Sequence, residues 1–328
     1  MHDYTQLIQN AMSHCLIETD LTIGSKYRGK VRDVYDLGDT LMLITTDRQS
    51  AFDRVLASIP YKGQVLNLIS AWWFKKTRHI IPNHLISTPD PNVIIAKKCT
   101  VFPIEFVVRN YITGTTNTSL WTQYQNGVRD YCGHHFPEGL KKNQKLPSAI
   151  LTPTTKDPVH DKAISEREII QTQLMTEEEW KVASSAALRL FEFGVKTAKQ
   201  HGLILVDTKY EMGRDADGNI MLIDEVHTPD SSRYWLEKSY AQRFAEGQEP
   251  ENIDKEFLRL WFAEQCDPYQ DTLLPEAPEA LVVTLSSRYI QLYELITGMM
   301  FPFPQGKYSV LERIKRNIDR KIVQDLPC

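Results

Sequence analysis

Apolar and polar positions follow two different periods along the chain and predict strands first and helices later. Residues 30–47 contain two apolar runs joined by the turn-forming Leu37-Gly38-Asp39. The pattern over residues 92–112 predicts a second pair of strands, with Pro103 near the middle as a break or an edge position. Between these pairs, apolar residues recur at helical spacing over residues 65–81. The first third of the chain is therefore predicted to be mainly β-structure with one internal helix.

The next segments predict loops and then a long amphipathic helix. Residues 109–160 are rich in hydroxyl side chains, Asn, Gly and Pro, which indicates long loops and short elements. Thr176 precedes an apolar pattern and has Glu179 three residues later, the arrangement of a capping box at a helix start. Gly202 follows the last apolar position and predicts the end of that helix.

A β-hairpin is predicted over residues 203–226. Asp217-Gly218 lies between apolar flanks and is a preferred sequence for a two-residue turn. Because side chains alternate along a strand, this turn would place Glu211 directly opposite Asp224. Two further polar residues would share the same face of the hairpin: Asp207 and Lys209. The remainder of the chain is predicted to be mostly helical, with proline-rich breaks.

These elements together predict an α+β fold in two lobes. Residues 1–108 would form a β-rich N-terminal lobe, and residues 109–328 a larger α+β lobe that ends in a helical extension. A chain of 328 residues is long for a single core, which favours the same division. A ligand is expected between the two lobes.

Composition and charge narrow the class of protein. The chain is 42% hydrophobic and 24% charged, with a formal net charge of −4, so we expect no nucleic-acid partner. No apolar run approaches the length of a membrane span, and the first residues do not resemble a signal peptide. The five cysteines are scattered, which is typical of reduced thiols in a cytoplasmic protein. A monomer and a homodimer both remain open.

The predicted hairpin brings two carboxylates together. Glu211 and Asp224 would repel each other on one sheet face, by about 0.2–1 kcal/mol, unless a positive group lay between them. Lys209 is one candidate, and Mg²⁺ bound through carboxylates and phosphate oxygens is another. The alternative is a solvated polar face with a salt bridge.

Four basic residues occur at strict two-residue spacing in the segment GSKYRGKVR: Lys26, Arg28, Lys30 and Arg32. In an extended chain they would share one face. Gly24 and Gly29 would let the backbone approach a ligand closely, which suits a cover over nucleotide phosphates. The alternative is an exposed sheet edge protected by lysine.

Three loops carry hydrogen-bond donors of the kind that bind phosphate. Arg109 leads into a Gly-Thr-Thr-Asn-Thr-Ser run that ends at Ser119, and residues 151–162 contain Lys156, His160 and Asp161. The third loop is Asp230-Ser231-Ser232-Arg233. Turn and capping chemistry is the simpler explanation for each loop alone. His227 and the two serines lack a nucleophile elbow, so a Ser–His hydrolase is not expected.

Six segments, in order along the chain, resemble the motifs of the phosphoribosylaminoimidazole-succinocarboxamide synthase (SAICAR synthetase) family of purine biosynthesis. They are RGKVRDVYD, TTDRQSAFD, VVRNYITGT, LTPTTK, ILVDTKYEMG and IDEVHTPDSSRYW, and they span Tyr27 to Trp235 approximately. The resemblance implies a two-lobed ATP-binding fold of the longer form of the family, similar to protein kinases and ATP-grasp enzymes. It also implies the ATP-dependent ligation of L-aspartate to carboxyaminoimidazole ribotide (CAIR) through an acyl phosphate.

The same resemblance implies roles for individual residues. Binding of ATP and Mg²⁺ is expected at Gly29, Lys30, Val31, Arg32, Lys209, Glu211 and Asp224, with Glu211 and Asp224 as the metal ligands. Substrate binding is expected at Arg109, Ser119, Asp161, Asp230, Ser232 and Arg233. Catalytic roles fall to Lys209, Asp230 and Lys156, with Asp230 a candidate base for the amine of aspartate.

Two other functions share some of these features. An inositol-phosphate-type small-molecule kinase would use the same Asp-x-Lys spacing of VDTKYEMG and the same Mg²⁺ chemistry. A nucleotide-binding protein without activity is the second alternative, although no expected ligand position carries Ala or Gly in place of a functional side chain.

Overall fold

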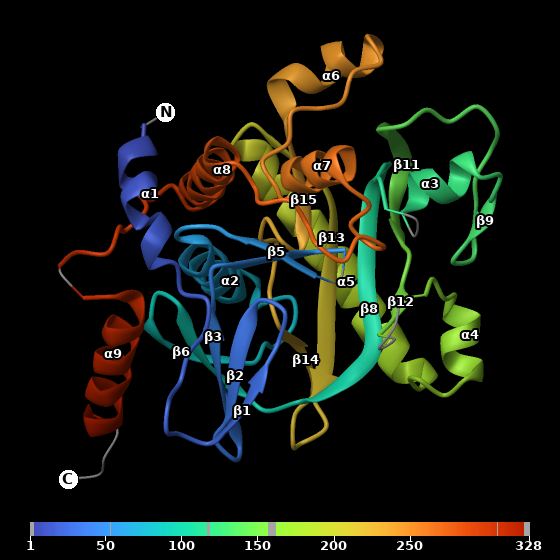
Figure 1. The fold of residues 1–328 in the computed structure, drawn as a ribbon. Coiled ribbons are helices and arrows are strands. Elements are labelled where there is room, and N and C mark those ends of the chain that lie inside the picture. Colours follow the sequence, from blue (N-terminus) through green and yellow to red (C-terminus); the bar gives the residue numbers. More distant parts are fainter. Residues whose placement is uncertain (1–2, 53, 117–118, 157–161, 307, 325–328) are drawn as a thin grey trace.

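The computed structural model describes residues 3–52, 54–116, 119–156, 162–306 and 308–324. Two antiparallel sheets form its framework (Figure 1). The first has the strand order β1-β2-β3-β7-β6, with β1 at Ser25–Arg28, β2 at Arg32–Asp36, β3 at Thr40–Thr45, β6 at Leu85–Asp90 and β7 at Val93–Lys97. The second has six strands: β8 (Thr100–Ile112), β11 (Gln144–Leu151), β12 (Thr154–Thr155), β13 (Leu203–Arg214), β14 (Ile220–Ile223) and β15 (Ser232–Leu236).

Two long helices match the helices predicted from apolar periodicity. α2 (Lys62–Thr77) packs between the first sheet and α8 (Glu279–Thr297). α5 (Glu177–Gln200) covers the back of the second sheet in Figure 1, and its capping box joins Thr176 and Glu179 as predicted. The other helices are α1 (Thr5–Ala11), α3 (Leu120–Gln125), α4 (Glu166–Gln171), α6 (Glu237–Ala245), α7 (Glu256–Gln265) and α9 (Val310–Gln324), with a 3₁₀ turn at Met12–His14.

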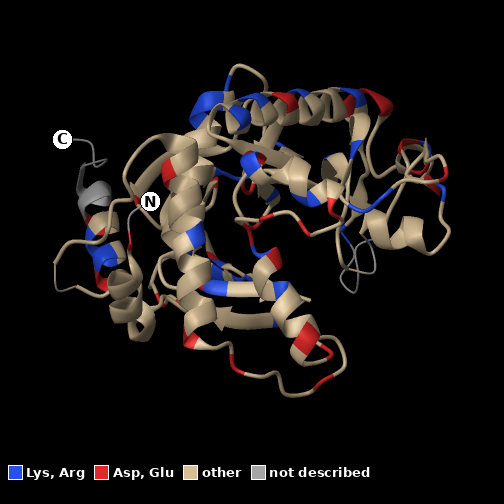
Figure 2. Cartoon of the chain, turned by 90° about the horizontal axis from the view of Figure 1, so that it is seen from above, with Lys and Arg blue, Asp and Glu red and all other residues tan. Residues whose placement is uncertain are grey.

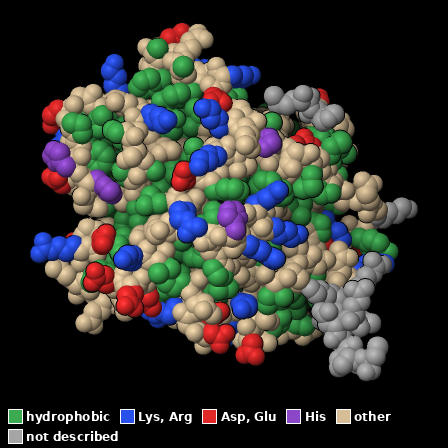
Figure 3. All heavy atoms as spheres, turned by 180° about the vertical axis from the view of Figure 1, so that it is seen from behind, with side chains coloured by type: hydrophobic (Ala, Val, Ile, Leu, Met, Phe, Trp, Pro, Cys, Tyr) green, Lys and Arg blue, Asp and Glu red, His purple; other side chains and the backbone are tan. Residues whose placement is uncertain are grey.

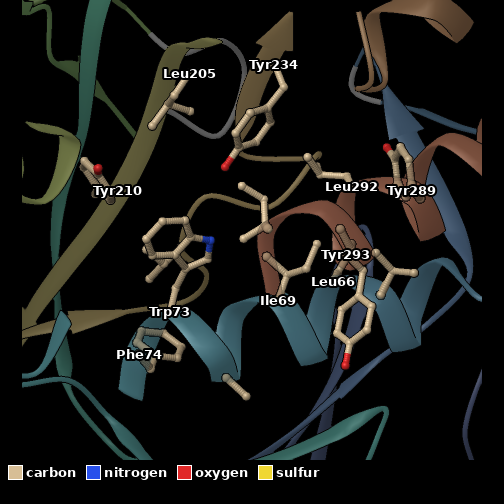
Figure 4. Packing of buried hydrophobic residues seen from close by; sticks show 14 of the residues in the cluster. Leu66, Ile69, Trp73, Phe74, Leu205, Tyr210, Tyr234, Tyr289, Leu292 and Tyr293 are labelled. Carbon is tan, nitrogen blue, oxygen red and sulfur yellow. The ribbon is translucent and has the colours of Figure 1, made fainter. Parts of the chain in front are cut away.

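The main hydrophobic core lies where α2, α8 and the second sheet meet. Figure 4 shows Trp73 and Phe74 of α2 near Tyr210 of β13 at one end of this core, and Tyr289 and Tyr293 of α8 at the other end. This core joins elements from both ends of the chain, so the strands of the second sheet are fixed relative to α2 and α8. On the far side of the first sheet, Ile314 and Ile318 of α9 cover a smaller apolar cluster.

The segment 92–112 does not fold into a strand pair, which corrects the prediction. β7 belongs to the first sheet and β8 to the second, because the chain changes sheets at Lys98 and Cys99. Pro103 does not end β8 either, since the register between β8 and β13 shifts around it as a bulge. The predicted division at residues 108 and 109 falls inside β8, and the two-domain assignment itself stays a prediction.

The four basic residues do not share one strand face, which is a second correction. The chain turns at Gly29-Lys30-Val31, where the Gly29 N–H donates to the Arg32 carbonyl at 2.8 Å. Lys26 and Arg28 therefore lie on β1 and Arg32 on β2. The Lys26 ammonium is 3.1 Å from Glu18 and 3.4 Å from Asp33, away from the expected phosphate cover.

The hairpin register is the third correction. Glu211 lies opposite Ile223, not Asp224, because the loop has three residues, Ala216-Asp217-Gly218, instead of two. The Asp215 N–H donates to the Asn219 carbonyl at 3.0 Å and closes this loop. Asp224 falls just past the end of β14 with φ of 64°, a left-handed conformation that redirects its side chain.

Two short ribbons complete the fold. β4 (Arg48–Ala51) pairs with β5 (Arg54–Ser58), and β9 (Asp130–Tyr131) pairs with β10 (His134–His135). Figure 2 shows acidic and basic residues intermingled on the strands and loops in the middle of the molecule. Seen from behind, hydrophobic, acidic and basic side chains share the surface, with several Lys and Arg gathered near its middle (Figure 3). No helix in the described ranges is long and apolar enough to cross a membrane.

Candidate active site

A cleft of about 390 Å³ lies between the two sheets and the start of α7. The β1–β2 turn and β4 line it from the first half of the chain, and β8, β13, β15 and the segment before α7 line it from the second. Of the residues predicted to bind ligands, those that line the cleft are Lys30, Val31, Arg32, Arg109, Lys209, Asp224, Asp230, Ser232 and Arg233. The structure thus brings together residues that lie far apart in the sequence.

One end of the cleft is a network of carboxylates and lysines. The Lys209 ammonium lies 2.7 Å from Glu105 of β8 and 2.7 Å from Glu211. Lys156 donates to the other oxygen of Glu211, so both carboxylate oxygens of Glu211 accept from lysines. Burial favours the neutral acid, but these two ammonium groups outweigh it and hold the pKa of Glu211 below its usual range.

Arg32 connects the first sheet to the segment that follows β14. Its guanidinium donates to Asp224 at 2.6 Å and to Glu225 at 3.0 Å. Burial raises the pKa of Asp224, Arg32 opposes this, and the nearby carboxylates of Glu211 and Glu225 raise it further. Asp224 therefore lies close to Glu211 despite the shifted register, because its left-handed backbone turns it into the cleft.

Glu211 and Asp224 have the chemistry of a magnesium site that is completed by a nucleotide. Within the described residues, no group of three or more His, Cys, Asp or Glu side chains could hold a metal alone. Mg²⁺ needs no such cage, since it commonly binds through one or two carboxylates and several phosphate or water oxygens. Burial is the main cause of the raised pKa of Asp224, and the nearby carboxylates of Glu211 and Glu225 raise it further, so a cation bound here would favour the ionised form. The residues present fit the ion.

The opposite end of the cleft is lined by arginines. Asp207 of β13 accepts from Arg109 at 3.2 Å and from Arg233 at 2.7 Å. Thr152 accepts a further bond from Arg109 Nε at 2.8 Å. Glu256, at the start of α7, lies 3.4 Å from Arg259 and 3.8 Å from Arg233. Three guanidinium groups thus surround two carboxylates, an arrangement that can bind a phosphate.

Ser119 reaches this arginine end through a close backbone approach. A side chain on Gly114 would lie 2.4 Å from the Ser119 Cβ and 3.5 Å from the Arg233 guanidinium. Gly114 has φ of 110°, a conformation that other residues rarely adopt. Glycine is therefore required at position 114 for Ser119 and Arg233 to lie close together beside this backbone.

Asp230 lines the same cleft and is held by a buried ammonium group and a buried hydroxyl group. The Lys62 ammonium at the start of α2 is 2.8 Å from one of its oxygens, and the Tyr289 hydroxyl of α8 donates to the other at 2.7 Å. Burial opposes ionisation, but Lys62 and Lys255 hold the pKa of Asp230 below its usual range. Lys255 itself faces the cleft, where burial and then Arg259 lower its pKa to about 8.

His227 is a core residue. It is completely buried, its ring lies against the edge of Trp73, and its Nε2 bonds to the Tyr210 hydroxyl. Burial lowers the pKa of His227 to about 3, so the ring is neutral at physiological pH. A Cβ added to Gly194 would lie 2.4 Å from this ring, which shows how tightly the ring is packed. These contacts leave no catalytic role for His227.

Several residues in or beside the cleft were not predicted from the sequence: Lys62, Glu105, Glu225, Lys255, Arg259 and Tyr289. The four-residue spacing of Lys255 and Arg259 on one helix face was a signal that could have identified that pair. Lys62 and Tyr289 carry no local signal, because their role depends on contacts across the fold. Asp161 and His160 lie outside the described residues.

Comparisons with known proteins agree on one family. A family model described as SAICAR synthetase matches residues 25–275. Phosphoribosylaminoimidazole-succinocarboxamide synthase of Legionella pneumophila (strain Paris) is 66% identical over 309 residues, covering 94% of this chain and 99% of the relative. The chloroplastic relative of that name from Arabidopsis thaliana is 60% identical over 320 residues, covering 96% of this chain and 78% of the relative.

Two solved structures extend the similarity to the fold. The SAICAR-synthase from Saccharomyces cerevisiae complexed with SAICAR has a TM-score of 0.75 at 32% identity, with 87% of this chain and 99% of that chain covered. A SAICAR synthetase (Type-2) in complex with ADP has a TM-score of 0.65 at 26% identity, with 85% and 100% covered. The two-lobed α+β fold predicted from the sequence is therefore confirmed.

Proposed function

The chain belongs to the SAICAR synthetase family, and we propose that it joins L-aspartate to the carboxylate of CAIR, with conversion of ATP to ADP and phosphate. The observation that carries this proposal is the presence of cationic side chains at both ends of the cleft: lysines at one end and arginines at the other. A ligase of this kind must hold the triphosphate of ATP and the 5′-phosphate of the ribotide at once. A small-molecule kinase is not favoured, because the family match covers most of the chain.

The carboxylate–lysine end is proposed to bind ATP with Mg²⁺. Gly29, Lys30, Val31 and Arg32 in the β1–β2 turn would cover the phosphates, and Lys209 would contact them from β13. Glu211 and Asp224 would hold the ion. When bound, Mg²⁺ would neutralise phosphate charge during phosphoryl transfer. The ADP complex of a related SAICAR synthetase supports a nucleotide site in this fold.

The arginine end is proposed to bind the ribotide phosphate. Arg109 and Arg233 would grip it with Ser119, and Arg259 adds a third guanidinium from α7. Ser232 lies beside Arg233 on β15 and bonds to Thr208 at 2.7 Å, which fixes it at the cleft wall. The base of the ribotide and its carboxylate would then lie near Asp230, facing the nucleotide end.

The proposed reaction has two steps. An oxygen of the CAIR carboxylate attacks the γ-phosphorus of ATP, the bond from that phosphorus to the bridging oxygen breaks, and ADP leaves. The amine of aspartate then attacks the acyl phosphate carbon, the carbon–oxygen bond to phosphate breaks, and the departing phosphate takes the proton that the amine loses. Lys209 and Lys156 would stabilise the charge that develops on the transferred phosphoryl oxygens.

Aspartate needs both a binding group for its carboxylates and a base for its ammonium. Lys255 faces the cleft beside Asp230 and is proposed as a carboxylate-binding group. The family resemblance makes Asp230 the candidate base. Its lowered pKa makes it a weak proton acceptor, so we propose that it acts mainly by orienting the substrates.

A coupled assay of ADP release tests the function directly. ADP should form only when CAIR, aspartate and ATP are all present, and mass spectrometry should find the succinocarboxamide product. Phosphoryl transfer to an inositol or a nucleoside without aspartate would reject the proposal in favour of a kinase.

We also propose that the enzyme works in the cytoplasm. The four cysteines in the described ranges are free thiols, which suits a reducing compartment. Separation of cell fractions followed by the same assay would locate the activity.

A further inference from the structure

The β1–β2 turn, which is proposed to cover the ATP phosphates, is held on one side through its carbonyl groups. The Gly29 carbonyl accepts from Arg48 Nη2 at 3.0 Å, and the Lys30 carbonyl accepts from Arg48 Nε at 3.1 Å. The Val31 carbonyl accepts from the Thr46 N–H at 2.9 Å and from the Thr46 hydroxyl at 2.8 Å. All three residues of the turn are therefore fixed on one side.

Arg48 has the contacts of a rigid support. It is 2% exposed at the start of β4, and its Nη2 also donates to Asp33 at 2.9 Å. Asp33 is completely buried and accepts from the backbone and the hydroxyl of Thr19 at 2.7 and 2.8 Å. A fourth bond joins Arg48 Nη1 to the Ile17 carbonyl. The guanidinium is thus tied to three separate segments.

The direction of these carbonyls determines the direction of the amides. In a planar trans peptide the N–H points opposite to the C=O of the same unit. The N–H groups of Lys30, Val31 and Arg32 therefore point away from Arg48 and Thr46. All three residues line the cleft, and the Arg32 amide lies across the hairpin from Gly29. The Lys30 and Val31 amides, on the side of the turn away from Arg48, are the ones that would face the phosphates. Successive amides of this kind make an anion-binding concavity.

We propose that Arg48 is a positioning residue for ATP, which acts by holding the turn with its amides directed into the cleft and does not touch the nucleotide. This inference rests on the proposed function, since it assumes that nucleotide phosphates bind on the side of the turn opposite Arg48. It assigns a role to the segment TTDRQSAFD, whose part in the site is not evident from the sequence.

Arg48→Lys tests the inference, with Arg313→Lys as the matched control. Lysine keeps the charge beside Asp33 but lacks the planar fork whose Nε and Nη2 bond to the two turn carbonyls. Arg313 forms a similar pair with Asp90 at 3.0 Å, between α9 and β6. Isothermal titration calorimetry would measure the Kd for Mg-ADP and for CAIR separately, and thermal unfolding would report stability.

We expect Arg48→Lys to raise the Kd for Mg-ADP by about tenfold or more while the Kd for CAIR changes by less than about twofold. Arg313→Lys should leave both constants unchanged, although it lowers the unfolding midpoint. Unchanged Mg-ADP affinity in Arg48→Lys, or an equal loss of affinity for Mg-ADP and CAIR, would overturn the inference.

Thr46→Val provides a second variant in case Arg48→Lys does not fold. Valine nearly matches threonine in shape but removes the hydroxyl that donates to Val31. Thr77→Val is its control, since Thr77 is also completely buried and bonds to the Trp73 carbonyl at 2.8 Å within α2. Thr46→Val should weaken Mg-ADP binding by about threefold and Thr77→Val should not. Equal effects of the two variants would contradict the proposed positioning role.

The wild-type protein separates this inference from the proposed function. If it converts CAIR and aspartate and binds Mg-ADP, the function stands and the Arg48 and Thr46 variants decide the positioning role alone. If it does not bind Mg-ADP, the nucleotide site itself is wrong and the inference falls with it.

Discussion

At the scale of single residues, the pKa of Asp224 is subject to opposing effects of burial and of neighbouring charges. Burial raises its pKa, Arg32 opposes this, and Glu211 and Glu225 raise it further. A carboxyl whose pKa is raised on folding stabilises the folded state at low pH and loses that contribution as the pH rises through the folded pKa. Ionised Asp224 therefore costs stability near neutral pH, which indicates that it is retained for function.

Asp224→Asn should lower kcat by about a hundredfold or more, because the proposed Mg²⁺ ligand is lost while the side-chain shape is kept. The unfolding midpoint near neutral pH should stay the same or rise, since an unfavourable buried charge is removed. Steady-state kinetics and thermal unfolding would measure both. Asp217→Asn, at the exposed hairpin loop, is the control. Near-normal turnover in Asp224→Asn would contradict its role as a metal ligand.

His227 should contribute to stability and not to catalysis. Because the pKa of His227 in the folded protein is lowered to about 3, its contribution to the free energy of unfolding is complete above pH 6.5 and is lost as the pH falls toward 3. The wild-type protein should lose unfolding free energy as the pH falls from about 6.5 to about 5, and in His227→Gln this loss should be smaller by about 2 kcal/mol. The kcat of the variant should stay within about threefold of the wild-type value near neutral pH. Chemical denaturation at several pH values would measure this.

His135→Gln serves as the control for that experiment. His135 is exposed on β10, so its replacement should change the unfolding free energy far less than His227→Gln does. A loss of turnover in His227→Gln near neutral pH without loss of folding would show that His227 takes part in catalysis after all.

At the scale of elements, α2 must approach the first sheet closely to carry Lys62 to Asp230. A side chain on Gly63 would lie 2.3 Å from the Thr45 carbonyl and 2.7 Å from the Asn92 amide. Only glycine permits this approach, and the Gly63 N–H also donates to Asp47 at 2.9 Å.

Gly63→Ala should therefore lower both stability and kcat, because the start of α2 has to move and takes Lys62 with it. We expect about a tenfold loss of kcat and about 2 kcal/mol of unfolding free energy. Gly218→Ala is the control: it has open space but φ of 83°, so it should cost about 1 kcal/mol and leave kcat unchanged. Equal turnover in the two variants would argue against α2 as the support of the site.

The elements also show which parts of the structure the sequence could predict. α2, α5 and the β2–β3 turn follow from local periodicity and capping, and the structure confirms them. The predicted hairpin register was wrong because the Asp215 side chain accepts from the backbone N–H groups of Asp217 and Asn219, which adds one residue to the loop. Asp224 still reaches the cleft, but through its backbone conformation and not through cross-strand pairing.

At the scale of the whole molecule, the cleft contains groups that no local pattern predicts. Strand pairing partners, such as β8 with β13, and the approach of α8 to the cleft depend on contacts between distant segments. The predicted site residues came mostly from the family resemblance. Lys62 and Tyr289 were missed because a buried lysine and a tyrosine within an apolar helix look like ordinary residues of those helices.

Tyr289→Phe should impair turnover although the fold is kept. The hydroxyl bonds to Asp230 from a helix 59 positions further along the chain, and its loss should leave Asp230 less well oriented. We expect kcat to fall by about three- to tenfold in steady-state assays. Tyr293→Phe, one turn further on the same helix and in the same core (Figure 4), should retain normal turnover. Equal kcat in all three proteins would restrict α8 to a purely structural role.

If Mg²⁺ and nucleotide bind at this end of the cleft as proposed, the pairing of Glu211 with Lys156 and Lys209, and of Asp224 with Arg32, makes ligand binding an exchange of ions. Mg²⁺ alone would have to displace ammonium and guanidinium groups, which would leave Lys209 with only Glu105 and Arg32 with only Glu225 as anionic partners. Nucleotide alone would have to draw those cations away from carboxylates left without a counterion. When both arrive together, the metal takes the carboxylates and the displaced cations take the phosphates. Thermodynamic linkage then makes each ligand raise the affinity for the other.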